Sequence, residues 1–344
     1  MLGHSSSSGF SGVRSIFAPN ASFDESSKIY FLLFIVVLTG FAFRIGSVLF
    51  SYPLITHPDE PTLMDIASRM ISERDPNPHF FNYPTLVIYL QVITISTVAA
   101  IQKAFLGVNY SDIPYVHFFV AGRIVATVAS TVSLLAIFAV GRKLFNPWVG
   151  LSAAAITAIS PLHIQNSALV TTDIWVAVFS TFVLLSCSHI YSERRPLFYA
   201  AAGIFVGLAT SSKYTAIISF IIIIVAHLAS QPLRVRSLLD FRMVIAGLAT
   251  IFSFVATSPF VVLDSATSLV HLEAERQHYR RGHLGAEAEG AHSYELYVNA
   301  LLSPNGLGYL IGMVALAGVF FALKRELRPL LLVLMATHFD PARG

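Results

Sequence analysis

Apolar runs of near-membrane length recur along almost the whole chain. They cover about residues 29–50, 84–105, 116–140, 148–165, 173–190, 197–211, 214–229, 240–262 and 296–322. A helix needs roughly 20 apolar residues to cross the hydrocarbon core of a bilayer. With 55% of its 344 residues hydrophobic and 12% charged, the chain has more apolar surface than one water-soluble core can bury. We therefore expect an all-α polytopic membrane protein.

The ends of the chain differ from this apolar body. Residues 1–28 are rich in serine and lack the apolar core and cleavage site of a signal peptide, so we expect a disordered cytoplasmic N-terminus. One transmembrane domain is expected over residues 29–338, followed by a tail at residues 339–344. The apolar stretch from Pro329 is too short to span a bilayer, so we expect this domain to be C-terminally truncated. The sole cysteine, Cys187, excludes an internal disulfide and a cysteine metal site.

The distribution of lysine and arginine predicts the orientation in the membrane. After residue 140, basic residues are concentrated in every second connection, and the positive-inside rule places these connections in the cytoplasm. They are Arg142, Lys143, Arg194, Arg195, Arg234, Arg236, Arg242, Lys324, Arg325 and Arg328. A first outer loop at residues 51–83 and a large outer loop at residues 263–295 then face outward. Since the net charge is +3, we attribute this bias to topology and expect no nucleic-acid partner.

The segment 84–105 is the weakest of the predicted spans. It contains Gln91, Gln102 and Lys103, and full crossings by both 84–105 and 116–140 would put the basic turn at residue 142 outside. We therefore expect 84–105 to dip into the outer leaflet or to lie along it.

Ionisable residues gather at the predicted outer boundary. They are Arg44, Asp59, Glu60, Arg123, Asp173, Lys213, Arg280, Arg281 and His283. Charges at membrane depth are costly unless they are paired or hydrated, so such residues suggest a functional site. Cations could hold the oxygens of a lipid phosphate, and a carboxylate could take a proton from a hydroxyl.

Structural roles explain most of these residues at least as well as a functional role when each residue is taken alone. Asp59 and Asp173 both stand where a helix is expected to begin, so capping accounts for them. Lys213 could extend to the headgroups, and the arginines of the outer loop could simply be solvated. The histidines of the outer loops lack the tight helical spacing of a metal site, so no metal ligand is predicted. The common location of the charged residues is what favours a functional interpretation.

Several short segments form a recognisable set. They are His57–Glu60, residues 77–86, Gly141–Phe145, Ser160–His163, Thr172–Asp173, Ala209–Thr215 and Gly282–Gly285. This set resembles bacterial membrane glycosyltransferases related to the protein O-mannosyltransferases (glycosyltransferase family 39) and to the aminoarabinose transferase of lipid A. The resemblance runs from about residue 30 to about residue 325.

The resemblance implies a fold and a reaction. The fold would be a GT-C type transmembrane helix bundle whose first outer loop carries short interfacial helices. The donor would be a polyprenyl- or dolichyl-phosphate-linked sugar, transferred with inversion on the outer face to a glycan, lipid or protein. Asp59 matches the family's catalytic aspartate, Glu60 its neighbour, and Asp173 a second acidic residue of the site. Related oligosaccharyltransferases use a divalent metal and the mannosyltransferases are thought not to, so a metal cofactor stays open.

Further residues are candidates for binding substrate. Tyr83 lies in the Asn-Tyr-Pro part of the resemblance. On electrostatic grounds Lys213, Arg280 and Arg281 are candidates for the donor phosphate, and His283 lies beside them in the large outer loop. The plasma membrane of a prokaryote is the expected location.

Two other classes of function stay open. A secondary transporter or lipid flippase is one, although transporters tend to have repeated halves with a site at the bilayer midplane. A non-catalytic subunit or fragment is the other, because the C-terminal part expected from the resemblance is missing.

Overall fold

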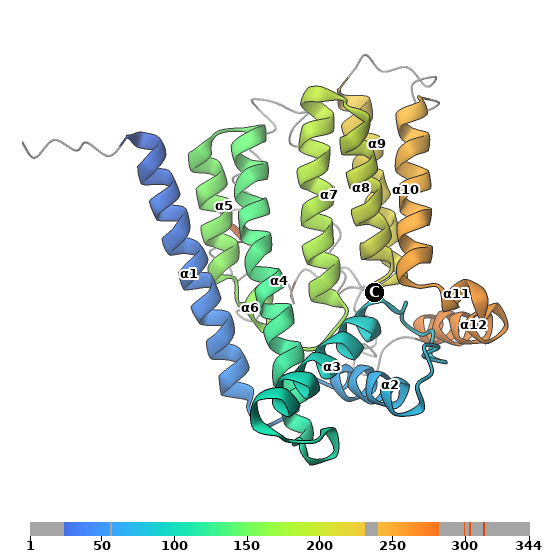
Figure 1. The fold of residues 1–344 in the computed structure, drawn as a ribbon. Coiled ribbons are helices and arrows are strands. Elements are labelled where there is room, and N and C mark those ends of the chain that lie inside the picture. The colour runs from blue at the N-terminus through green and yellow to red at the C-terminus, as the bar shows by residue number, and fades with distance from the viewer. Residues whose placement is uncertain are drawn as a thin grey trace, which may run out of the picture.

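The computed structural model describes residues 24–55, 57–230 and 240–281, together with residues 299, 303, 312 and 313. Within these ranges the regular elements are helices (Figure 1). In chain order they are α1 (Glu25–Ser51), α2 (Asp59–Glu73), α3 (Leu86–Leu106), η1 (Tyr110–Asp112), α4 (Tyr115–Leu144), α5 (Pro147–Ile159), α6 (Pro161–Ser167), α7 (Asp173–Glu193), α8 (Pro196–Thr210), η2 (Tyr214–Ser219), α9 (Phe220–Ala229), α10 (Phe241–Thr257), α11 (Phe260–Leu263) and α12 (Ser265–Arg281). The all-α fold class is therefore confirmed. Apart from residues 299, 303, 312 and 313, the apolar run 296–322 lies outside the described residues, and so does the tail 339–344.

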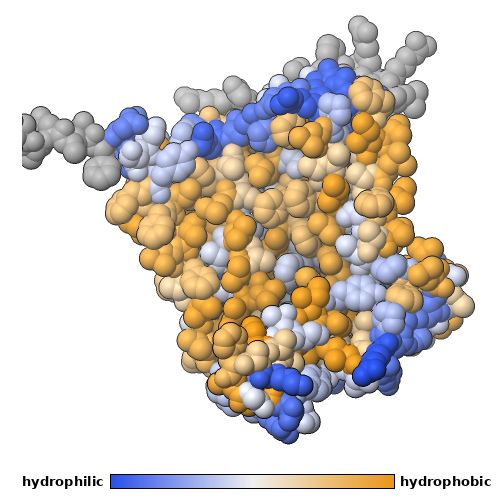
Figure 2. Space-filling model, viewed as in Figure 1, coloured by the Kyte–Doolittle hydropathy of each residue, from blue (hydrophilic) through white to orange (hydrophobic). Residues whose placement is uncertain are grey.

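The helices account for most of the predicted spans. Among the described residues, α1, α3, α4 and α7 are long and apolar enough to cross a membrane, and α5 with α6 could form a fifth, bent span. Figure 2 shows a broad apolar belt between hydrophilic margins at the two ends of the bundle. This arrangement is that of a multi-pass integral membrane protein.

Helices α4, α5, α7, α8, α9 and α10 alternate in direction, so the basic connections meet at one end of the bundle (Figure 1). We call this the basic end; it carries Lys28, Arg142, Lys143, Arg194, Arg195 and Arg242. We call the opposite end, where α2, α3, α11 and α12 lie, the outer end. The positive-inside rule predicts that the basic end faces the cytoplasm, and this orientation stays a prediction.

Helix α3 differs from the other long helices in its placement. It is inclined across the outer end and packs against α2 and the first part of α4 (Figure 1). Its length and composition would nevertheless allow a crossing. The expectation that 84–105 does not cross the bilayer therefore stays a prediction.

A sharp bend separates α5 from α6, where the chain reads Ser160-Pro161. The two helices meet at 63°, because proline cannot donate the backbone hydrogen bond that would continue α5. The fully buried Arg44 of α1 covers this break, donating from Nη1 to Ala158 O at 3.2 Å and from Nη2 to Thr157 O at 3.3 Å. Its Nη2 also lies 2.9 Å from Nδ1 of His163. Arg44, which the sequence grouped with the outer charges, thus serves the helix break.

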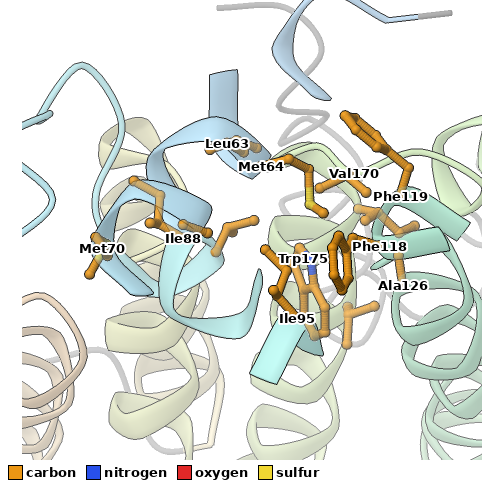
Figure 3. Close-up of a cluster of buried hydrophobic side chains, with 14 of the residues drawn as sticks. Leu63, Met64, Met70, Ile88, Ile95, Phe118, Phe119, Ala126, Val170 and Trp175 are labelled. Carbon is orange, nitrogen blue, oxygen red and sulfur yellow. The ribbon is translucent and has the colours of Figure 1, made fainter. Parts of the chain in front are cut away.

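A buried apolar cluster fixes α2 to the bundle (Figure 3). Leu63, Met64 and Met70 of α2 pack with side chains of α3, α4 and α7. Leu63 and Met64 are completely buried, and burying one such side chain contributes about 1.5–3 kcal/mol. The first turn of α2, with Asp59 and Glu60, is therefore held on a rigid support.

Close packing of α8 on α10 brings the C-terminal ends of these two helices together beside the segment that precedes α3. A Cβ atom added at Gly203 would lie 2.2 Å from Ala246 O, and one at Gly207 would lie 2.5 Å from Thr250 O. Neither distance leaves room for a side chain, so the two helices need glycine at both positions. The last turns of α8 and α10 can then both contact Thr85 and Leu86.

Candidate active site

Asp59 stands at the first position of α2, at the outer end of the bundle. Its backbone N–H donates to Nδ1 of His57 at 3.2 Å, so the imidazole satisfies one of the open donors at this helix start. The hydroxyl of Tyr83 donates to Oδ2 of Asp59 at 3.3 Å. The positive end of α2 also favours a negative charge here. Since Asp59 is half-buried, a substrate can approach its carboxylate while the helix and Tyr83 hold it.

Glu60, the next residue, is in a very different environment. It is completely buried and binds Arg123 of α4 through two bonds, from Nε to Oε1 at 2.8 Å and from Nη2 to Oε2 at 2.7 Å. The backbone N–H of Val170 donates to Oε1 at 2.9 Å. This buried carboxylate therefore ties α2 to α4 and to the segment before α7.

Asp173 and Lys213 form a second pair at the outer end. Asp173 begins α7, and Lys213 follows α8, just before η2. Nζ of Lys213 lies 3.0 Å from Oδ1 of Asp173, and the side chains are 12% and 25% exposed. The topology derived from the sequence placed these two residues on the same face, and the structure brings them into direct contact.

The remaining predicted residues stand at or beyond the last described helix. Arg280 and Arg281 lie at the C-terminal end of α12, which is at the same end of the bundle as α2 (Figure 1). The described part of the structure does not include their side chains, and His283 lies outside it.

A polar clasp joins the first outer loop to the start of α12. Nε2 of His79 lies 2.9 Å from Oδ2 of Asp75, and its Nδ1 lies 3.6 Å from Oδ2 of Asp264. The backbone N–H of Asn77 and then His79 lower the pKa of Asp75 below its ordinary value of 3.8. The side chain of Asn77 and then Thr267 lower the pKa of Asp264 in the same way. Both carboxylates are therefore stabilised in their charged form.

Among the described residues, no three His, Cys, Asp or Glu side chains are grouped so that they could hold a metal ion. The site carboxylates Asp59 and Asp173 instead bind a tyrosine hydroxyl and a lysine. This donor set does not fit a resident metal within the described ranges.

Sequence reasoning missed two partners in this site. Arg123 was recognised as an outer-end cation, but nothing local indicated that it binds Glu60, which is 63 positions away. His57 belongs to the His-Pro-Asp-Glu segment, and its contact with the backbone of Asp59 gives that spacing a physical reason.

Part of the chain matches a known protein family in sequence. Residues 117–262 match the family described as dolichyl-phosphate-mannose-protein mannosyltransferase. No curated protein matches the chain in sequence.

Solved structures are similar in fold. An Archaeoglobus fulgidus oligosaccharyltransferase in complex with Zn and sulfate gives a TM-score of 0.59 at 16% identity, covering 90% of this chain and 46% of that one. The A. fulgidus oligosaccharyltransferase AglB, with an inhibitory peptide and a dolichol-phosphate, gives 0.52 at 16% identity, covering 90% and 38%. The S. cerevisiae protein O-mannosyltransferase Pmt1-Pmt2 complex, bound to the sugar donor, gives 0.49 at 17% identity, covering 73% and 34%. The chain thus spans less than half the length of each of these three structures.

Proposed function

Because the chain has the GT-C fold of membrane glycosyltransferases, we propose that it transfers a sugar from a lipid-phosphate carrier to an acceptor hydroxyl. The observation that carries this proposal is the setting of Asp59. Its half-buried carboxylate is held by Tyr83 at the outer end, where Lys213 and Asp173 also lie. A general base and a cation at one membrane boundary suit a substrate with a lipid tail and a phosphate head.

The reaction can be written for these residues. The carboxylate of Asp59 takes the proton of the acceptor hydroxyl as its oxygen forms a bond to the anomeric carbon. The bond from that carbon to the phosphate oxygen breaks on the opposite side, and its electron pair leaves with the lipid phosphate. Attack from the opposite side inverts the anomeric centre. General-base assistance of this kind is typically worth about 10²–10⁴-fold.

The other residues support this step in different ways. Lys213, together with Arg280, Arg281 and His283, would offset the charge that develops on the phosphate. Asp173 would hold Lys213 in place through their ion pair. Glu60 would position Asp59, since it is completely buried and bound to Arg123.

The finer assignments rest on the resemblance. A hexose or pentose of the mannosyl type, carried on a polyprenyl or dolichyl phosphate, would be the donor. The dolichol-phosphate bound to AglB supports a carrier of this class. A glycan, lipid or protein on the outer face would be the acceptor, and the plasma membrane of a prokaryote would be the location.

A transfer assay tests the proposal. Membranes containing the chain are supplied with radiolabelled polyprenyl-phosphate sugars, and Asp59→Asn is compared with Glu73→Gln, an exposed carboxylate on the same helix. Label should leave the lipid with the wild type and Glu73→Gln, and turnover should fall about 10²–10⁴-fold with Asp59→Asn.

Two results would point to the rival functions. Labelled lipid that changes leaflet without losing its sugar would favour a flippase. Donor binding without transfer by a correctly inserted chain would favour a non-catalytic role.

A further inference from the structure

The short segment from Phe81 to Leu86 is held by distant parts of the chain. The carbonyl of Phe81 accepts from the hydroxyl of Tyr214 at 3.1 Å, and Thr85 donates from its backbone N–H to Oγ of Ser258 at 3.1 Å. Leu86 donates from its backbone N–H to the carbonyl of Ser211 at 3.2 Å. These contacts come from η2, from the residue after α10 and from the residue after α8. The segment that leads into α3 thus has a fixed path.

Helix α12 adds two contacts at the other end of this segment. The backbone N–H of Phe81 donates to Nδ1 of His271 at 3.1 Å, and Nδ2 of Asn82 donates to Oε2 of Glu275 at 3.0 Å. His271 and Glu275 are four residues apart on one face of the helix, because α-helical side chains at this spacing are neighbours. Glu273, between them, is exposed.

The held segment carries Tyr83, which bonds Asp59. Tyr83 follows Asn82 directly, so the two contacts from α12 contribute to where its backbone lies relative to α2. Phe81 is completely buried, and its ring packs against the imidazole of His271 with the centroids 6.1 Å apart. A displacement of α12 would therefore move the backbone of Tyr83 and its hydroxyl.

We propose that His271 and Glu275 are positioning residues that set the Tyr83 hydroxyl against the carboxylate of Asp59. The inference rests on the proposed role of Asp59 as general base. It places control of that base in the large outer loop, about 190 positions along the chain from Phe81.

His271 and Glu275 must both act as hydrogen-bond acceptors in these contacts. A backbone N–H donates, so Nδ1 of His271 must be the unprotonated nitrogen of the ring. An asparagine at 271 offers a carbonyl oxygen at a similar distance from the backbone, whereas alanine offers no acceptor. A glutamine at 275 likewise keeps an acceptor for Asn82, and alanine does not.

Kinetics separate positioning from bulk stability. In His271→Ala and Glu275→Ala, kcat should fall up to about tenfold each, with the KM for the donor unchanged, because one neutral hydrogen bond is lost in each case. His271→Asn and Glu275→Gln should recover most of the rate. Glu273→Ala is the matched control on the same helix and should behave as the wild type. Equal losses in the alanine variants and in their conservative counterparts would overturn the proposal.

A spectroscopic readout tests the geometry without any turnover. The chain is labelled with 3-fluorotyrosine, and the ¹⁹F signal of Tyr83 is assigned as the one missing in Tyr83→Phe. This signal should shift in His271→Ala, return in His271→Asn and stay in place in Glu273→Ala. An unchanged Tyr83 signal in a folded His271→Ala variant would refute positioning. If the signal shifts but the wild type transfers no sugar, the proposed reaction is wrong and the positioning stands.

Discussion

The two ends of the helix bundle use the same types of charged residue for different purposes. At the basic end, Lys143 lies 2.8 Å from Glu193, and both side chains are about one-third exposed, at 32% and 33%. At the outer end, the Arg123–Glu60 pair has side chains that are 1% and 0% exposed. The first pair is exposed at the ends of α4 and α7, whereas the second is buried and joins α2 to α4.

The difference shows that the burial of a charged residue decides its role: exposed charges orient the chain in the membrane, and buried charges hold the elements of the site together. Exposed basic residues orient the chain through their total number at one end, so replacing any one of them should change stability little. Buried pairs act individually, because removing one partner leaves a charge that nothing compensates. A charged residue in this protein should therefore be judged by its partner and its burial.

Breaking the buried pair at the outer end should have the largest effect. Glu60→Leu leaves the Arg123 guanidinium buried without its carboxylate, so the free energy of unfolding should fall by about 3–5 kcal/mol. Thermal unfolding in lipid nanodiscs measures the change. The double variant Glu60→Leu/Arg123→Met should regain much of the loss, since it removes both charges. A single variant as stable as the wild type would remove the distinction between the two ends.

The half-buried pair should have an intermediate effect, seen in transfer. Asp173→Asn removes the charged partner of Lys213, and a hydrogen bond between charged groups contributes about 1.5–3 kcal/mol. We expect kcat/KM for the donor to fall about 10- to 100-fold. Lys213→Met should do the same, whereas Lys103→Met, at an exposed position near the end of α3, serves as the control. Equal rates in all three variants would exclude Lys213 from the site.

Acid should loosen the clasp between the first outer loop and α12. The pKa values of Asp75 and Asp264 are lowered in the folded chain, so their contribution is complete above the ordinary value of 3.8 and is lost as pH falls through the lowered values. Limited proteolysis between residues 75 and 83 should therefore become faster as the pH falls below 3.8. In Asn77→Ala, which removes the side-chain donor to Asp264 while the backbone N–H at position 77 can still donate to Asp75, the acceleration should begin at higher pH. Acid-independent cleavage would show that these carboxylates do not hold the loop.

Breaking the exposed pair at the basic end should have the smallest effect. Lys143→Met should change the free energy of unfolding by less than about 1 kcal/mol, because exposed ion pairs are screened by solvent. Transfer should be unchanged, since this end is remote from Asp59. A loss of transfer in a stable Lys143→Met variant would show that the two ends are coupled.

Much of the fold could be predicted because lipid imposes a simple rule on sequence. The expected runs 29–50, 116–140 and 173–190 became α1, α4 and α7, with ends shifted by a few residues. The run 148–165 was less informative. Its composition suits one span, yet the proline at 161 divides it, and the angle of the bend depends on packing that no local pattern records.

The candidate site was predicted in part. Topology brought Asp173 and Lys213 to one face, and the short motifs singled out Asp59, Glu60 and Tyr83. The pairing of Glu60 with Arg123 could not be predicted. Asp59 and Glu60 are adjacent in sequence, and the difference in their burial arises only when α2 packs on α4. The contact between Phe81 and His271 spans 190 positions, and a single sequence carries no signal for such a distance.

The contacts of Arg44 restrict how the helices around it can move. One guanidinium bonds to Gly40, Thr157 and Ala158 and contacts His163, so α1, α5 and α6 cannot slide past one another without stranding a charge away from water. These three helices should therefore move together as one rigid group. Any rearrangement that admits a bulky lipid tail or releases a product would then occur by movement of the other helices relative to these three.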